Sequence, residues 1–481
     1  MTNGRRRPVA GRGPLLAAAL LVALLAGPAW AAGETVFLSL EEVWALAEIH
    51  HPAVREARRE VAALERTLAQ REAAYAPSLT VRSEGLGVRI RPEGDADPFR
   101  PGVSLSAGLK LPAGLQLSAT VTVQERATGS QDSNVRGTLN LSYPLFRDPS
   151  LDEDALARRE AAVSLEAGRR RLEEARQQAR VEALAALRET AAAARRLELA
   201  EAAYADAVRV RGIVEQQAAA GTIAESDLLA ADVELLRAEQ ERAVAQRTYE
   251  TRRAQLLRLL GLAEDQGHYE FEIPWDWLAM PPVDAVEAAV ARAVARSVDV
   301  WERREAVETA RLQLAAERAR SGLETHFSVS YMTRGQQEQD REQPGWQVGV
   351  QASYPLLDGG QRRLAVASRE DAVARAQEAL EEARRDVQQQ VEELMFQLED
   401  ARRQVEIARL ELARAELEWT AVQRQLALPV PAATPDQAAA AQRARARAEL
   451  AWQEATWAYQ NRWLELQILQ GAVDWSALSG E

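Results

Sequence analysis

The sequence predicts a mainly helical fold with a β-barrel portion, built from a tandem duplication of long helical hairpins. Two observations support this prediction. A strand of alternating polar and apolar residues leads through Tyr-Pro-Leu into a very long helix, first at Tyr143, Pro144 and Leu145 and again at Tyr354, Pro355 and Leu356. In each half, two shorter helices placed end to end equal the long helix in length, at about 1.5 Å per residue. We therefore expect two copies of one structural unit in the chain.

Residues 1–31 are expected to be a signal peptide. Arg5, Arg6 and Arg7 precede an apolar segment over residues 15–25, and Ala29-Trp30-Ala31 offers a cleavage site with small residues at both ends. A membrane anchor is the alternative, but this apolar segment is short for spanning a bilayer.

The composition excludes several classes of partner and site. The chain is acidic, with a formal net charge of −13, which argues against nucleic acid as a partner. The same charge suits a solvated surface, or a water-filled lumen that favours cations. The chain has no cysteine, so it has no disulfides, no thiolate metal ligands and no lipid-modified cysteine.

The first repeat is expected to cover residues 32–261. A cap at Ser39 opens a helix to about residue 74, and Pro52 marks a kink or a fresh start at His51. Strands are expected over residues 80–146, a long helix over residues 151–219 and a return helix over residues 223–260.

The strand region alternates small polar with aliphatic residues at period two. On one candidate strand Leu117, Val121 and Val123 oppose Ser118 and Thr120. Alternation of this kind, in segments of about ten residues, is typical of transmembrane β-barrels. The signal is weak for any one strand, and the edge of a soluble β-sandwich would look similar.

Apolar residues recur at seven-residue steps along both long helices, which predicts left-handed coiling against neighbouring helices. The first row is Leu165, Leu172, Ala179, Ala186, Ala193, Ala200, Ala207 and Val214; the second is Val366, Val373, Leu380, Val387, Leu394, Ala401, Ala408, Ala415 and Val422.

A linker rich in aromatic and acidic residues, 262–282, joins the repeats and is expected to pack across the helices at mid-length, although an ordinary surface loop is an equal alternative.

Trp346 and Tyr354 stand at the two ends of an apolar band, as in strands that cross two lipid interfaces. The second repeat, 283–471, is expected to hold a helix over 283–321, a β-hairpin over 326–357, a long helix over 361–427 and a return helix over 435–471, before a tail at 472–481.

The sequence offers no support for an enzyme, a cofactor or a metal site. It lacks a phosphate-binding glycine loop, a nucleophile elbow and a metalloprotease helix motif. The adjacent His50 and His51 would point apart on a helix. Glu215 and Arg424 could line a constriction near the ends of the long helices, but ordinary exposed polar residues are the stronger interpretation for each.

The chain resembles the TolC-like outer-membrane efflux protein family over almost its whole length after the signal peptide. The resemblance rests on Ser39-Leu40-Glu41-Glu42 with His51-Pro52, on both Tyr-Pro-Leu segments, especially the one followed by Leu357-Asp358-Gly359-Gly360, and on the turn Gly221-Thr222-Ile223. The order and spacing of these features are more specific than any one of them.

The resemblance implies a homotrimer in the outer membrane of a Gram-negative cell, with a large periplasmic portion. Its protomers would share one lipid-facing transmembrane β-barrel above a periplasmic α-barrel, and the Tyr-Pro-Leu segments with Gly359 and Gly360 would form the barrel-to-helix junction. The periplasmic tips, at Gly221, Thr222, Ile223, Leu428 and Pro429, would dock an adaptor protein that leads to an inner-membrane transporter of an efflux or type I secretion system.

The sequence departs from the family at two places. The family supplies two strands per half, whereas residues 80–146 hold four candidates. By position, residues 80–90 and 135–146 should form the barrel pair, which leaves 103–124 as an extra hairpin of unknown placement. The second tip contains Pro429 and Pro431, which remove amide donors and stiffen the turn.

A passive outer-membrane conduit is the interpretation that explains most of these features. The alternative is a periplasmic coiled-coil adaptor or scaffold that does not cross the membrane. That alternative explains the helices and the signal peptide, but it explains neither the alternating strands nor the doubled junction. The sequence does not identify the cargo.

Overall fold

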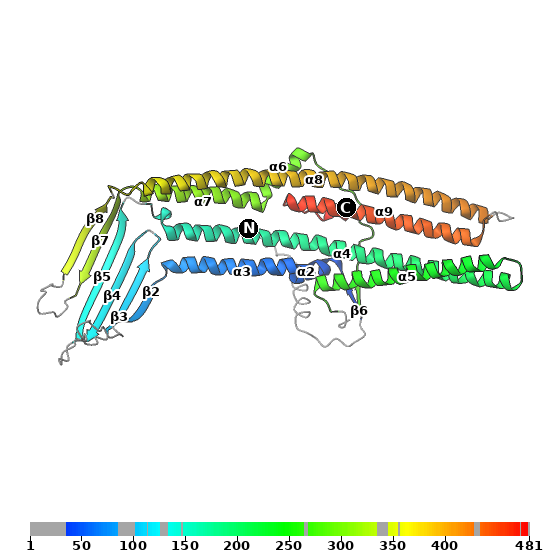
Figure 1. Cartoon of the computed structure of the whole chain (residues 1–481), viewed down its shortest axis with the longest axis horizontal. Coiled ribbons are helices and arrows are strands. Elements are labelled where there is room, and N and C mark those ends of the chain that lie inside the picture. The colour runs from blue at the N-terminus through cyan, green and yellow to red at the C-terminus, as the bar shows by residue number, and fades with distance from the viewer. Residues whose placement is uncertain are drawn as a thin grey trace, which may run out of the picture.

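A computed structural model describes residues 35–84, 102–112, 114–125, 133–145, 148–263, 268–333, 345–354, 356–427, 433–471 and 473–479. The molecule is elongated. A β-sheet forms one end, and long helices run from it to the opposite end (Figure 1). The predicted signal peptide lies outside the described residues.

The first repeat starts with two helices in line, α2 (Leu40–His50) and α3 (Pro52–Glu72), which lead to the sheet. Ser39 caps α2 through reciprocal hydrogen bonds with Glu42, as a capping box does. After the sheet, α4 (Glu153–Ala219) runs along the molecule and packs against the return helix α5 (Glu225–Leu260). The long helix begins two residues later than predicted, because a 3₁₀ turn, Pro149–Leu151, precedes it.

The second repeat has the same plan. Helices α6 (Val286–Arg296) and α7 (Val298–Arg320) lead to the sheet, and α8 (Gln361–Leu426) packs against the return helix α9 (Pro435–Leu469). The expectation of one uninterrupted helix over 283–321 is wrong, because the chain breaks at Ser297.

The breaks in the two repeats are structurally equivalent. His51 has φ −56° and ψ 132°, and Ser297 has φ −52° and ψ 129°. Each caps the following helix with its side chain: Ala53 N donates to His51 Nδ1 at 3.3 Å, and Val300 N donates to Ser297 Oγ at 3.4 Å. A proline marks the first break, whereas only the serine marks the second.

Six strands form one antiparallel sheet in the order β2-β3-β4-β5-β7-β8. They are β2 (Ser78–Glu84), β3 (Gly102–Lys110), β4 (Gln116–Glu125), β5 (Ser133–Leu145), β7 (Glu324–Met332) and β8 (Gly345–Ser353). The first and last strands of the first repeat, β2 and β5, both lie in this sheet, but they are not neighbours. The extra hairpin, β3 and β4, lies between them in the sheet.

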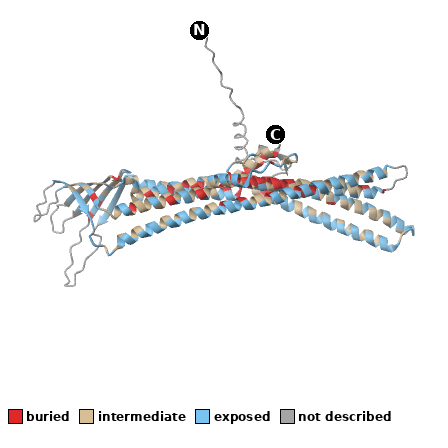
Figure 2. Ribbon diagram, turned by 90° about the horizontal axis from the view of Figure 1, so that it is seen from above, coloured by how far each residue is buried: buried red, intermediate tan, exposed pale blue. Residues whose placement is uncertain are grey.

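The main hydrophobic core lies at mid-length, where Figure 2 shows the buried residues gathered. Leu184 of α4, Leu256 of α5, Val391 of α8 and Leu464 of α9 are completely buried there. Every residue of the two predicted seven-residue rows is buried or half-buried, and none is exposed, so these rows are the packed faces of α4 and α8.

The linker packs across the helices at mid-length, as expected. Its strand β6 (His268–Phe271) pairs in parallel with β1 (Thr35–Leu38), ahead of α2. The Tyr459 hydroxyl of α9 donates a hydrogen bond to the Pro281 carbonyl at 2.6 Å. The predicted tail also contributes to the core, because α10 (Ser476–Ser479) buries Leu478 completely.

Candidate membrane-spanning sheet and helical tips

The sheet has two chemically different faces. Because side chains alternate along a strand, the register places apolar residues from all six strands on one face. One row across the sheet is Leu79, Ala107, Ala119, Leu139, Tyr331 and Trp346, and the next is Leu109, Leu117, Leu141, Val329 and Val348. Many of these side chains are exposed: Leu79 by 70%, Trp346 by 67% and Val348 by 64%.

The opposite face carries mainly hydroxyl and amide groups. The row between the two apolar ones is Ser78, Gly108, Ser118, Asn140, Ser330 and Gln347. Thr120 and Ser106 form a cross-strand hydrogen bond on this face at 3.4 Å. A water-exposed polar face and an exposed apolar face are what a strand between lipid and an aqueous lumen presents.

The two predicted interface aromatics lie at opposite ends of β8. Trp346 stands near the end away from the helices and contacts Tyr331, with ring centroids 4.8 Å apart. Tyr354 follows the helix-side end of the strand, and the Arg362 guanidinium of α8 lies over its ring at 5.1 Å. Their separation along the strand agrees with positions at two lipid interfaces.

The two Tyr-Pro-Leu segments differ in structure. Tyr143, Pro144 and Leu145 continue β5, and Thr325 Oγ1 of β7 donates to the Leu145 carbonyl at 2.8 Å. Proline has no backbone N–H to donate to a neighbouring strand. Pro144 is tolerated because the pairing between β4 and β5 ends at Ser142, so no hydrogen bond to β4 is lost at Pro144. In the second segment β8 ends before Tyr354; Leu356 is 89% exposed, and Pro355 lies outside the described residues.

Asp358 organises the start of α8. It accepts hydrogen bonds from the backbone N–H groups of Gly360 at 2.9 Å and Arg362 at 3.1 Å. These bonds favour the carboxylate and lower the pKa of Asp358. Gly359 and Gly360 adopt positive φ angles of 65° and 84°, which turn the chain from the sheet into the helix.

The first helical tip is a compact turn. Gly221 has a φ of +73°, and the backbone N–H and side-chain Oγ1 of Thr222 both donate to the Gln217 carbonyl, at 3.0 and 2.8 Å. Ile223 follows in the same turn. Leu428 and Pro429, predicted for the second tip, lie outside the described residues.

The structure does not bring Glu215 and Arg424 together. Glu215 pairs with Arg211 of its own helix at 2.7 Å, and Arg211 also pairs with Asp232 of α5 at 2.9 Å. Arg424 is exposed near the end of α8, and no ion pair joins it to Glu215 among the described residues. The sequence did not reveal the ion pairs that link α4 with α9 near this end, Arg209 with Asp436 at 2.8 Å and Arg443 with Asp206.

A buried arginine at mid-length was also missed. Arg188 of α4 is 1% exposed and donates from Nη2 to Gln460 Oε1 of α9 at 2.6 Å. Burial lowers the pKa of Arg188 to about 9. Gln460 in turn donates to the Trp277 and Ala279 carbonyls of the linker at 2.9 and 2.7 Å, so this network joins both repeats. Nothing distinguishes Arg188 from its surface neighbours in an arginine-rich sequence.

Within the described residues, no helix is long and apolar enough to cross a lipid bilayer. The same residues contain no group of three or more histidine or acidic side chains that could hold a metal ion.

Known proteins share this architecture. Residues 289–472, most of the second repeat, match the family model of the outer membrane efflux proteins. No curated protein matches the chain.

Three solved structures illustrate the likeness. A membrane protein from Pseudomonas aeruginosa is 15% identical, with a TM-score of 0.59 over 90% of each chain. The outer membrane protein VceC from Vibrio cholerae is 16% identical, with a TM-score of 0.57 over 92% of this chain and 96% of its own. The CmeC outer membrane channel of Campylobacter jejuni is 14% identical, with a TM-score of 0.56 over 90% of this chain and 85% of its own.

At these identities the likeness establishes the fold over nearly the whole chain, and the family match establishes the relationship in the second repeat. The duplicated architecture joins both repeats in one fold. Residues 289–472 therefore match the outer membrane efflux protein family, and nearly the whole chain has the fold of known outer-membrane proteins such as VceC and CmeC.

Proposed function

We propose that three copies of this protein form a passive duct, which carries cargo from a periplasmic adaptor and an inner-membrane transporter to the exterior. The two uncovered faces of the sheet are the observation on which this proposal depends. Lipid would cover the apolar face and water the polar face once the sheet closes into a barrel. The family is one of channels rather than enzymes, and the duct performs no covalent step and has no energy source of its own.

The strand directions allow copies to join. β2 runs away from the helices and β8 runs back toward them, because the strands alternate in direction across the sheet. These edge strands have no further partner within the described chain. The β2 edge of one copy can therefore pair antiparallel with the β8 edge of the next, and repetition of this heterologous contact closes a ring.

The helices present matching lateral surfaces. In the tip-side half α4 packs against α5 and α9, and α9 packs against α8, so α5 and α8 are the outer helices. Both carry exposed apolar residues at steps of three, four, seven, eight or eleven residues, and all of these steps stay on one face of a helix. These are Leu229, Val233, Leu236 and Val244 on α5, and Phe396, Ile407, Leu410 and Leu417 on α8.

The adaptor or scaffold alternative leaves the sheet unexplained. A protein that stayed in the periplasm would expose the apolar rows of all six strands to water. Patches of that extent on soluble proteins are normally covered by a partner or a membrane.

Planar-bilayer recording tests the duct. We expect the detergent-extracted protein to produce discrete conductance steps, with a preference for cations because the chain carries a net charge of −13. Addition at two salt gradients measures this preference through the reversal potential. A protein that stays soluble and monomeric without detergent would contradict the proposal.

Substitution of Gly221 tests the assignment of the tip. Gly221→Val should strain the turn by about 1–2 kcal/mol, because a β-branched residue disfavours the left-handed backbone conformation. Nothing lies within 4 Å of a Cβ atom at this position, so the damage should remain local. We expect weaker efflux through weaker adaptor coupling, and a normal yield of trimers on native gels.

Gly221→Asn is the matched control, because asparagine tolerates a positive φ. Efflux equal to wild type in cells that carry Gly221→Val would show that this turn is not the docking tip.

A further inference from the structure

The extra hairpin is fully built into the sheet. All seven residues of β2 pair with β3, and all ten residues of β4 pair with β5. The hairpin also continues both faces without a change of register. Leu105 and Val121 extend an apolar row that begins at Val81, and Ser106 and Thr120 extend a polar row that begins at Thr80.

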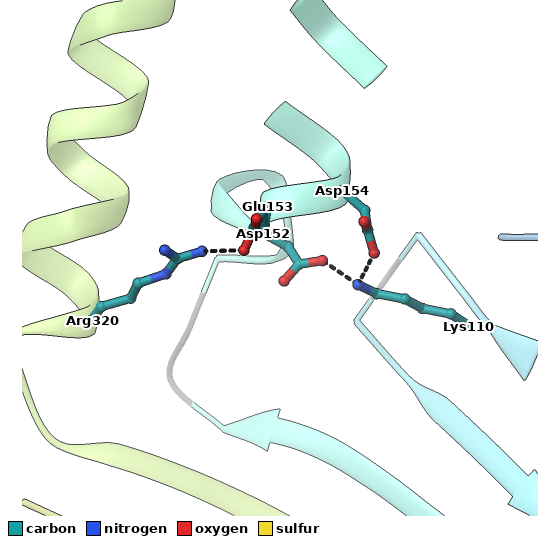
Figure 3. A network of polar contacts seen from close by, with 5 residues as sticks. All are labelled: Lys110, Asp152, Glu153, Asp154 and Arg320. Carbon is teal, nitrogen blue, oxygen red and sulfur yellow. Dashed lines mark hydrogen bonds and ion pairs between the residues drawn. The ribbon is translucent and has the colours of Figure 1, made fainter. Parts of the chain in front are cut away.

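Its helix-side turn is anchored to the start of α4 (Figure 3). Lys110 Nζ, at the end of β3, contacts Asp152 Oδ2 and Asp154 Oδ2 at 2.5 Å each. Lys110 is the only lysine in the chain. The turn is closed by a hydrogen bond from Leu111 N to the Leu115 carbonyl at 2.8 Å, and Gly114 is buried beside Pro144. The hairpin is therefore held at its strand edges and at its base.

We propose that β3 and β4 are wall strands of the channel, so that each copy contributes six strands and three copies close an 18-stranded barrel around a wide aqueous lumen. This inference rests on the trimeric duct proposed above. In closed barrels the diameter grows roughly in proportion to the strand number, and 16–18 strands are enough to leave an aqueous channel. Six strands per copy in place of four would widen the barrel about 1.5-fold.

The dimensions of the helical wall support six strands. Near the sheet, the helices of one copy pack side by side in the order α3-α4-α7-α8. Four helices at interaxial distances of about 9 Å cover roughly 36 Å of wall. Six strands spaced by about 4.8 Å and tilted by about 40° cover roughly 38 Å, whereas four such strands would cover only about 25 Å. The six-stranded sheet therefore fits the width of the helices below it.

Engineered disulfides test whether β3 and β4 separate β2 from β5. The chain has no native cysteine that could form competing disulfides. Leu79, Ala107, Ala119 and Leu139 lie in one row across the four strands. We expect oxidation to link Leu79→Cys with Ala107→Cys, and Ala119→Cys with Leu139→Cys, in trimers extracted from membranes. The pair Leu79→Cys with Leu139→Cys should stay unlinked, because three strand spacings, about 14 Å, exceed the reach of a disulfide. An efficient disulfide in this last pair would overturn the inference.

Excision of residues 102–125 tests the width of the pore. Gly102 pairs with Gln124 at the end of the hairpin away from the helices, so the cut ends lie side by side. β2 and β5 run in opposite directions and can pair directly after the excision. We expect a barrel with fewer strands, a disulfide between Leu79→Cys and Leu139→Cys, and a single-channel conductance lowered roughly twofold, as the smaller cross-section requires.

The outcomes separate the two proposals. If the full-length protein forms trimers with the expected disulfides but no channel in the bilayer, both the proposed duct and the proposed wide pore are wrong. If the full-length protein conducts but the shortened trimer conducts equally well, only the wide pore is wrong. Should the shortened chain fail to fold, the disulfide pattern of the full-length chain still decides where the hairpin lies.

Discussion

Replacement of Val329 by arginine is expected to prevent stable insertion of the barrel into lipid. Val329 lies near the middle of β7, between Leu141 of β5 and Val348 of β8 on the apolar face. An arginine on the lipid-facing side of a barrel costs about 2–4 kcal/mol at the bilayer midplane. This corresponds to a loss of roughly 30- to 1,000-fold in the ratio of folded to unfolded protein. Urea titration of folding into lipid vesicles measures the change.

The neighbouring residue supplies the matched control. Ser330 lies on the polar face, between Asn140 and Gln347, so Ser330→Arg should point into the aqueous lumen. We expect this variant to insert like the wild type. Equal losses in both variants would show that the sheet does not separate lipid from water, and normal insertion of Val329→Arg would assign the apolar face to a protein partner.

Substitution of Gly261 by alanine is expected to destabilise the mid-length core by about 2–5 kcal/mol. Gly261 ends α5 with a φ of +70°, in the left-handed region that alanine disfavours. A Cβ atom there would lie 2.5 Å from Cγ and 2.8 Å from Cβ of His50, the last residue of α2. His50 cannot relieve the overlap by rotating its ring, because its Cβ is itself too close. The midpoint of thermal unfolding in detergent, followed by circular dichroism, should fall.

Two variants separate the causes of this loss. Gly212→Ala makes the same change within α4, where nothing lies within 4 Å of the new Cβ, and should leave stability equal or slightly raised. His50→Ala in combination with Gly261→Ala should recover only the part of the loss due to overlap with the imidazole ring, because alanine keeps the Cβ atom at 2.8 Å, and should leave the backbone strain. A Gly261→Ala protein as stable as wild type would mean that α5 does not end against α2 in this way.

Periodic features of the fold were predictable from the sequence. The seven-residue rows identified the packed faces of α4 and α8, because a helix face repeats its apolar residues whatever the neighbour is. Alternation located all six strands of the antiparallel sheet, since each needed one apolar and one polar face. The break at His51 was visible because Pro52 cannot continue a helix with an intact amide ladder. The equivalent break at Ser297 was missed, because serine is tolerated inside helices as well as at their caps.

Features that depend on contacts between distant segments were not predictable. The position of β3 and β4 depends on which strand edges meet, and an alternating strand can pair with any other alternating strand. The role of Lys110 depends on Asp152 and Asp154, some forty residues away. Arg188 became distinctive only when α9 and the linker covered it. The ion pairs of Arg209 and Arg443 with residues of distant helices are likewise invisible in a sequence where arginine supplies almost all of the positive charge.

The hairpin of β3 and β4 occurs in the first repeat only, and this has a consequence for the symmetry of an assembled trimer. The two repeats give each copy two similar helical units, so the tube would have approximate sixfold symmetry. The sheet takes four strands from the first repeat and two from the second, so the barrel would have only threefold symmetry. A partner at the periplasmic end would meet six related surfaces, and a ligand at the exterior would meet three.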